Sequence, residues 1–362
     1  MGSCSNCLIN SSVDSKIQFD KKGVCNYCLS YYKAHNHSQQ LIAKNHFQDQ
    51  IQSIKRSNNS SYDCILGVSG GTDSSYVAYL LKKEGLNVLM VHCDNGWDTE
   101  IAVSNLKKIK EITGFDLLIR KMDTAAFYAV QRSFLKARVV DIELLSDHVN
   151  IASIYEVAHQ KKIPWIVTGE NINTEFFMPQ HWVHNKNDWQ QICAINNRFE
   201  KADTSSFPKL GPYKKYVIDQ QLRINYFKPL NYIDYNKDDA TKVLKKEFDW
   251  QDHGGKHFES NFTVFFQCYI LPEFFKVDKR IAHLSNLICS GILSRKKAQQ
   301  LLSEPTLPQN KLKYLKKYIL SKLELTENEF IDIMAKPISS HSNYRSHFVY
   351  NKYLQKVIQA FK

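Results

Sequence analysis

The chain has 362 residues, of which 43% are hydrophobic and 23% charged, values typical of a soluble globular protein with a full core. It contains no run of 18 apolar residues, and its start, MGSCSNC, lacks a charged and then apolar signal segment. We therefore expect a cytoplasmic protein without membrane insertion. Basic residues exceed acidic ones by 48 to 36, a net charge of +12 that favours anionic partners, although a solvated basic surface explains it equally well.

Two Cys-x-x-Cys pairs open the chain, Cys4 with Cys7 and Cys25 with Cys28. Each pair can place two thiolates on one metal ion, and four thiolates complete the tetrahedral shell of zinc. A closed shell leaves no open coordination position, so we expect a structural zinc ribbon over residues 1–35. An iron–sulfur cluster and a site without metal are the alternatives. The other five cysteines are expected to pack in the core.

Short apolar runs alternate with helical patterns after a polar linker helix at residues 36–60. Such alternation predicts an α/β fold with a doubly wound parallel sheet. The expected strands cover residues 64–68, 87–93, 117–119 and 163–167, and the expected helices cover 76–83, 100–113 and, with a bend or interruption, 127–160.

A glycine turn, SGGTDSS at residues 69–75, lies between the first strand and the first helix. Its two glycines let the backbone turn tightly with N–H groups directed into a concavity, and the helix adds the positive end of its dipole. The turn is therefore suited to phosphate. Asp73 would repel phosphate unless a divalent cation lay between them, which predicts magnesium. The candidate nucleotide-binding residues here are Ser69, Gly70, Gly71, Thr72, Asp73 and Ser74.

The turn lacks the lysine of the GxxxxGK[ST] phosphate loop. It resembles instead the SGGxDS signature of the PP-loop ATP pyrophosphatases, which have the adenine nucleotide alpha hydrolase-like fold. This resemblance implies cleavage of ATP between the α and β phosphates, with adenylation of a substrate oxygen and later displacement of AMP by a nucleophile. The alternative is an ordinary solvated loop.

Polar residues follow the second and fourth expected strands. Ligands of open α/β sheets bind beyond the carboxyl ends of strands. We therefore expect Asp94 and Asn95 to contact the adenine, the ribose or the cation. Gly169 should border the nucleotide, and Glu170 should be a second magnesium carboxylate beside Asp73. An Asx turn at Asp94 and a helix N-terminal carboxylate at Glu170 are the alternatives.

The chain also carries IQFDKKGVCNYC, VSGGTDSS, HCDNGW, VTGEN, LGPYKKY, GGKHFES and DKRIAHLSNLICSG. Together these segments, from about Cys4 to about Leu302, resemble the N-acetyl sugar amidotransferases of bacterial surface-polysaccharide synthesis, including lipopolysaccharide O-antigen. The resemblance implies ATP-dependent conversion of an acetamido group on a nucleotide sugar into an acetamidino group. It also implies a glutaminase that supplies ammonia and a cyclase-like channel subunit, both akin to histidine-biosynthesis proteins. The segment after Cys7 lacks the proline expected of this family, which affects only the turn of the ribbon.

The implied chemistry needs an activated amide oxygen, because ammonia does not displace it unaided. Loop N–H groups, magnesium and lysines would stabilise the charge that spreads over the phosphates. Within GGKHFES we predict Lys256 as a phosphate or transition-state cation and His257 as a proton carrier or binding residue, with Asp73 as the third catalytic residue. A helix-capping turn with Glu259 near the helix dipole explains the same segment equally well.

The expected domains are a zinc ribbon (1–35), a linker helix (36–60), a PP-loop ATP-binding domain with substrate loops (61–255) and a helical C-terminal region (256–362). Residues 176–228 are aromatic and polar, which suggests long binding loops. In the C-terminal region, Thr326 and Glu329 form a capping-box pattern, and a final amphipathic helix ends at Lys362.

The main alternative function is tRNA thiolation by a PP-loop enzyme, since such enzymes also combine a cysteine ribbon with a basic surface. Those enzymes carry a further cysteine pair after the phosphate loop, whereas no Cys-x-x-Cys follows Cys28 here. This absence favours the sugar enzyme and argues against nucleic acid as a partner. A third possibility is a zinc-ribbon binding module with an inactive loop.

Overall fold

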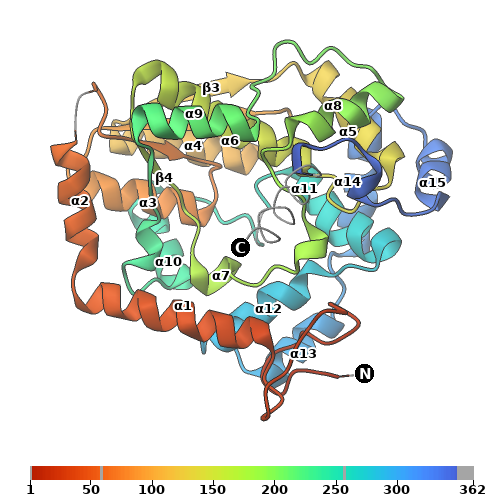
Figure 1. Cartoon of the computed structure of the whole chain (residues 1–362), viewed down its shortest axis with the longest axis horizontal. Helices are drawn as coiled ribbons and strands as arrows, with labels where there is room; N and C mark the ends of the chain where they lie inside the picture. Colours follow the sequence, from red (N-terminus) through yellow and green to blue (C-terminus); the bar gives the residue numbers. More distant parts are fainter. Residues whose placement is uncertain (1, 58–59, 256–257, 349–362) are drawn as a thin grey trace, which may run out of the picture.

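A five-stranded parallel sheet forms the centre of the protein, whose computed structural model describes residues 2–57, 60–255 and 258–348 (Figure 1). The strand order is β3-β2-β1-β4-β5, and every neighbouring pair is parallel. The chain therefore adds strands on one side of β1 and then on the other, which makes the sheet doubly wound, as predicted. The strands are β1 (Cys64–Gly67), β2 (Val88–Asp94), β3 (Asp116–Lys121), β4 (Trp165–Val167) and β5 (Asn225–Phe227).

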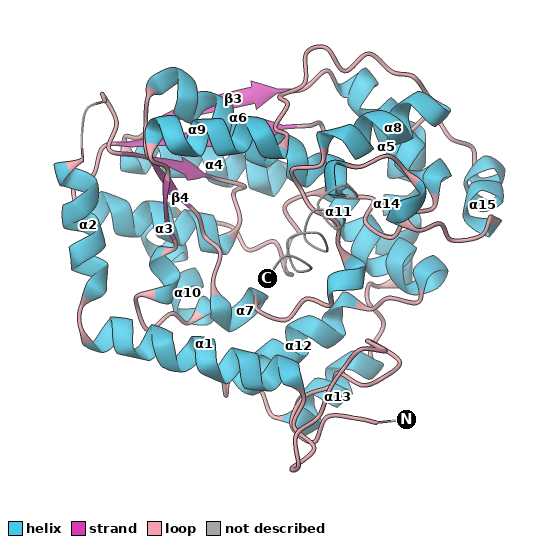
Figure 2. Ribbon diagram, in the orientation of Figure 1, coloured by secondary structure: helices cyan, strands magenta, loops and turns pink. Residues whose placement is uncertain are grey.

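Helices cover both faces of this sheet, which is why β1 and β2 are apolar on both sides (Figure 2). Leu66 in β1 packs in the same buried cluster as residues of α3 (Thr72–Lys83) and α4 (Glu100–Thr113). The preceding residue, Ile65, packs instead with Val157 and Ala158 of α6 (Leu144–Lys161). Alternate side chains of one strand thus anchor opposite layers.

The aromatic and polar region 176–228, in which we expected long loops, is partly regular. Residues 176–228 contain α8 (Trp189–Phe199), α9 (Pro212–Leu222) and the fifth strand, together with the short helix η1 (Gln180–Trp182). The strand is only three residues long and is exposed at two of them, so it has no apolar run. Only Ile218 of α9 is buried, which leaves little helical periodicity in its sequence.

The expected linker helix is two helices, α1 (Asn26–Ala43) and α2 (His46–Arg56). They are separated at Asn45, whose φ of 55° is left-handed. Helix α1 begins inside the ribbon and crosses residue 35, where we placed the first domain boundary. The expected helical stretch 127–160 is likewise two helices, α5 (Thr124–Ala137) and α6. The domain boundaries themselves remain predictions.

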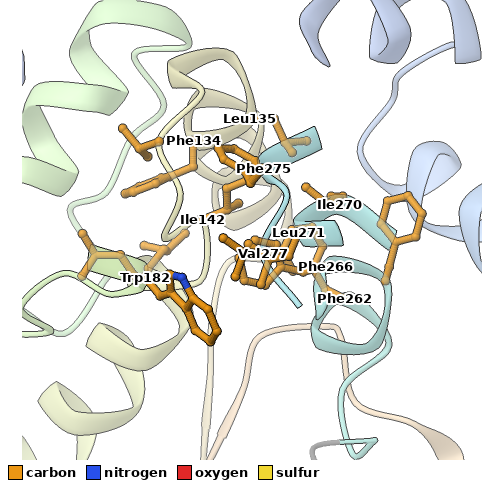
Figure 3. Close-up of a cluster of buried hydrophobic side chains, with 14 of the residues drawn as sticks. Phe134, Leu135, Ile142, Trp182, Phe262, Phe266, Ile270, Leu271, Phe275 and Val277 are labelled. Carbon is orange, nitrogen blue, oxygen red and sulfur yellow. The ribbon is translucent and has the colours of Figure 1, made fainter. Parts of the chain in front are cut away.

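The C-terminal region is helical, as expected, and packs against the rest of the protein through a large apolar cluster. Figure 3 shows Phe262, Phe266 and Phe275 of this region facing Phe134 of α5 and Trp182. Thr326 and Glu329 form the predicted capping box. The expected final helix falls largely on residues 349–362, outside the described part of the chain.

The remaining helices are α7 (Ile172–Glu175), η2 (Pro229–Asn231), α10 (Lys237–Phe248), α11 (Asn261–Phe265), the π-helix η3 (Phe266–Phe275), α12 (Lys279–Cys289), α13 (Arg295–Ser303), α14 (Gln309–Lys322), α15 (Glu327–Ala335) and η4 (His341–Asn343).

Among the described residues, none of the helices has the length and apolar character needed to cross a membrane.

Candidate nucleotide and metal sites

The glycine turn lies at the switch point of the sheet, where the chain leaves β1 for α3. Strands β2 and β4 flank β1, so the carboxyl ends of these three strands lie together at the edge of the sheet where open α/β sheets bind their ligands. Gly70 has a φ of 79°, and a Cβ atom there would lie 2.5 Å from the carbonyl oxygen of Ala102. Gly71 is the N-cap of α3 and makes no side-chain cap. The turn therefore needs glycine at position 70 both for its backbone angle and for its close contact with α4.

Three side chains converge on the carbonyl oxygen of Gly70. Asn105 Nδ2 donates to it at 3.1 Å and Trp250 Nε1 at 3.2 Å, and His253 Nε2 lies 3.0 Å away. They come from α4 and from the segment after α10, so distant parts of the chain fix the orientation of this peptide. Sequence reasoning missed all three, because only the tertiary fold brings them to the turn.

Replacement of Gly70 by alanine tests this constraint. We expect Gly70→Ala to lower the free energy of unfolding by roughly 2–4 kcal/mol, because the left-handed backbone and the contact with Ala102 both oppose a Cβ. Gly85→Ala is the matched control: Gly85 has a φ of 67° but nothing within 4 Å of a built Cβ. It should lose only about 1–2 kcal/mol in chemical denaturation. Equal losses would contradict the proposed packing.

Asp73 lies in the first turn of α3, and a side chain from a distant segment binds its carboxylate. The hydroxyl of Tyr235 donates a hydrogen bond to Asp73 Oδ1. Burial raises the pKa of Tyr235, and the Asp73 carboxylate raises it further, so the phenol remains a donor at neutral pH. One carboxylate oxygen of Asp73 is thus fixed by a neutral donor, which leaves the negative charge available to a cation.

The end of β4 closes against the start of α3. A Cβ built at Gly169 would lie 2.8 Å from the backbone nitrogen of Ser74, so only glycine fits without a shift. The neighbouring Thr168 Oγ1 is buried and has no hydrogen-bond partner among the described residues. Buried hydroxyls are normally paired, so this oxygen is available to a further polar partner.

The other predicted residues are placed as follows. Asp94 Oδ1 accepts a hydrogen bond from the backbone of Gly96 at 3.0 Å, and Asn95 Oδ1 accepts one from Trp97 at 3.2 Å, so both form turns at the end of β2. Glu170 is exposed and pairs with Lys228 Nζ at 2.6 Å.

Within the glycine turn, Ser69 Oγ lies 3.3 Å from the Gly71 backbone nitrogen, which donates to it. Thr72 is buried, and Ser74 Oγ lies 3.5 Å from Ser69 Oγ. Lys256 and His257 lie outside the described residues.

Glu259 approaches the glycine turn from the C-terminal region. Its backbone carbonyl accepts a hydrogen bond from Thr99 at 2.8 Å, and Asn261 donates to the Trp97 carbonyl at 2.8 Å. These bonds hold residues 259–261 beside the segment that follows β2. A Cβ at Gly71 would lie 1.8 Å from Glu259 Oε1, so the carboxylate rests directly against the second glycine of the turn. Sequence analysis placed Glu259 only near a helix dipole and missed this contact.

The four ribbon cysteines come together as predicted. Their sulfur atoms all lie within 4.8 Å of one another, and all four side chains are buried. The Sγ atoms of Cys4 and Cys28 are 3.8 Å apart, and Cys25 Sγ lies 3.6 Å from the sulfurs of Cys7 and Cys28. These distances are too long for disulfides and match the edge of about 3.8 Å expected for sulfur atoms about 2.3 Å from a tetrahedral zinc ion. The four thiols therefore fit a structural zinc.

Cys289 is buried in the core, as expected, and also contacts the ribbon cysteines. Its Sγ lies 3.5 Å from Cys28 Sγ, and Asn6 Nδ2 donates to Cys289 at 3.2 Å and to Cys28 at 3.5 Å. A fifth thiol on α12 thus touches the ribbon cluster, which links the ribbon to the C-terminal region. Cys289 and Cys28 are 261 positions apart, so no local pattern could reveal the contact.

The zinc content of two cysteine variants shows which thiols bind the metal and which only lie beside it. Cys28→Ser should lose the metal and unfold at a lower temperature, because zinc binding contributes directly to folding. Cys289→Ser should retain one zinc per chain, since four thiolates already close the shell. Elemental analysis and thermal melting measure both effects. Loss of the metal from Cys289→Ser would show instead that this thiol is a ligand.

Comparison with known proteins shows that the C-terminal part of the chain is similar to a described domain family. Residues 259–357 match the family model described as "LPS biosynthesis protein WbpG-like, C-terminal domain". The C-terminal region is similar to this WbpG-like domain. This match confirms the resemblance to surface-polysaccharide enzymes, and the WbpG-like domain begins at Glu259, the residue in contact with the glycine turn. No curated protein matches the chain significantly.

Solved structures with a similar arrangement include two synthetases. The NH3-dependent NAD synthetase from Campylobacter jejuni is 15% identical, with a TM-score of 0.31 over 79% of this chain and 94% of its own. The NMN synthetase from Francisella tularensis is 14% identical, with a TM-score of 0.31 over 81% and 97%. The U34-tRNA thiolase NcsA from Methanococcus maripaludis, with its [4Fe-4S] cluster, is 15% identical, with a TM-score of 0.27 over 68% and 82%.

Proposed function

We propose that the protein is an ATP-dependent, AMP-forming amidotransferase that converts the acetamido group of an N-acetyl nucleotide sugar into an acetamidino group. One observation carries the proposal: an SGGTDSS turn at the switch point of a parallel sheet shares a chain with a WbpG-like domain, whose first matched residue touches the turn. The turn supplies the nucleotide chemistry, and the WbpG-like domain supports a substrate from surface-polysaccharide synthesis.

In this proposal the α3 end of the glycine turn holds the phosphates through backbone N–H groups and the helix dipole. The residues present fit magnesium, because Asp73 offers a carboxylate fixed by Tyr235, and Glu170 follows the adjacent strand β4. When bound, magnesium would neutralise charge on the phosphates and the departing pyrophosphate. To bind the metal, Glu170 has to break its surface salt bridge with Lys228.

The reaction proceeds by exchange of oxygen for nitrogen. The acetamido oxygen forms a bond to the α phosphorus of ATP, and pyrophosphate leaves. Ammonia then adds to the imidate carbon, the carbon–oxygen bond breaks, and AMP departs with the former amide oxygen. The nitrogen sheds its extra proton, for which His257 is the proposed carrier, and Lys256 is the proposed cation for the phosphates. We further propose that a glutaminase and a cyclase-like channel subunit deliver the ammonia.

A direct assay tests this function. The purified protein with ATP, magnesium, high ammonium and a panel of UDP-linked N-acetyl sugars should form AMP and a product lighter by about one mass unit, because NH replaces O. Both signals should require the sugar. Release of AMP with no change in the mass of any N-acetyl sugar would contradict the proposed substrate class.

Asp73→Asn tests the metal carboxylate. We expect AMP formation to fall on the order of 100-fold or more, because the amide cannot neutralise a cation facing the phosphates, while thermal stability stays close to that of the wild type. Asp249→Asn is the matched control, since Asp249 is exposed and lies at the C-terminal end of α10. It should retain ordinary turnover. Ordinary turnover of Asp73→Asn would remove the argument for the metal.

The second candidate, tRNA thiolation, predicts a different set of results. It requires tight, salt-dependent binding of tRNA and loss of activity when a sulfur-carrying cysteine such as Cys193 or Cys268 is replaced. Both residues are partly exposed free cysteines, and neither belongs to a Cys-x-x-Cys pair. We therefore favour the sugar substrate.

A further inference from the structure

Glu259 occupies an unexpected position for an acidic residue. The turn beneath it is suited to anions, yet its carboxylate lies against Gly71, the residue that begins α3. Backbone hydrogen bonds on both sides of residue 260 fix the backbone of this segment, so the fold holds Glu259 beside the turn. The absence of a side chain at position 71 is what admits the carboxylate.

The charge on Glu259 is poorly compensated. Burial raises its pKa most, and the nearby Asp73 carboxylate raises it slightly, while its own backbone N–H, His253 and Lys237 lower it. No ion pair joins Glu259 to another residue in the described part of the chain. Two carboxylates therefore face the place where the turn would receive phosphates, and a bare triphosphate would add further negative charge beside them.

We propose that Glu259 makes the glycine turn selective for nucleotides that carry a divalent cation, and against free nucleotides and other bare anions. A cation between the phosphates and the two carboxylates converts their repulsion into attraction, whereas metal-free ATP meets Glu259 directly. This inference rests on the proposed function only in taking ATP as the ligand of the turn. It gives the WbpG-like domain, which begins at Glu259, a direct part in nucleotide binding.

Calorimetric titration of ATP without sugar tests the inference, once in excess magnesium and once in magnesium-free buffer without a chelator, so that the ribbon keeps its zinc. The ratio of the two dissociation constants measures selectivity for the metal complex. Glu259→Gln keeps the size of the side chain and removes its charge, so metal-free ATP should bind at least 10-fold more tightly than to the wild type. The affinity for the magnesium complex should stay unchanged or fall. The ratio therefore drops at least 10-fold.

Glu273→Gln is the matched control, because Glu273 is an exposed carboxylate in the same region and lies on η3. Its ratio should equal that of the wild type. Glu259→Ala supplies a second variant, in which the gain in metal-free binding should recur. If both Glu259 variants keep a ratio within threefold of the wild type, the inference is wrong although ATP binding stands. If the wild type binds ATP in neither condition, the proposed function fails and this inference fails with it.

Discussion

The left-handed backbone of Gly70 is the constraint on which the candidate site depends. At this residue the chain leaves the central strand and enters α3, and the contact with Ala102 leaves no room for a side chain. The Gly70 carbonyl is held by Asn105, Trp250 and His253, so α4 and the segment after α10 set the shape of the turn. An anion-binding turn must present the N–H groups of its backbone without rearrangement. Three external partners on one peptide provide that rigidity.

The C-terminal helices also help to shape the surroundings of the glycine turn. Their aromatic side chains pack on α5 in the largest buried cluster, and the strand-like contact of residues 259–261 with residues 97–99 brings Glu259 to the turn (Figure 3). The ribbon is tied to the same helices, because Cys289 of α12 touches Cys28. Ribbon, sheet and WbpG-like domain therefore form one packed arrangement, and loss of metal from the ribbon would be felt by the helices that carry Glu259.

Local patterns predicted the features whose causes are local. The apolar run of β1, the two glycines after it and the helix that follows all lie within about twenty residues, and the cysteine spacing alone indicated the metal cluster. Helix α4 ends at Gly114, as expected, because glycine takes the left-handed cap with a φ of 71°. Strand β5 and helix α9 were missed because they bury too few side chains to leave a period in the sequence.

Contacts between distant segments could not be predicted in this way. The partners of the Gly70 carbonyl, the Tyr235 hydrogen bond to Asp73 and the Cys289 thiol beside the ribbon all depend on how separate layers pack. Glu259 is the clearest case, since charge reasoning would not place a carboxylate beside a turn expected to bind phosphate. The proposed cation between the nucleotide and the carboxylates accounts for this position.

The most direct measurement is a crystal structure of the protein with magnesium and a non-hydrolysable ATP analogue. The account predicts that the phosphates lie against the backbone of residues 69–74, between the ends of β1 and β4, with the metal between them and Asp73. Phosphates bound elsewhere, for example over the lysines that line the shallow surface cavity at α4, with the glycine turn unchanged, would contradict it.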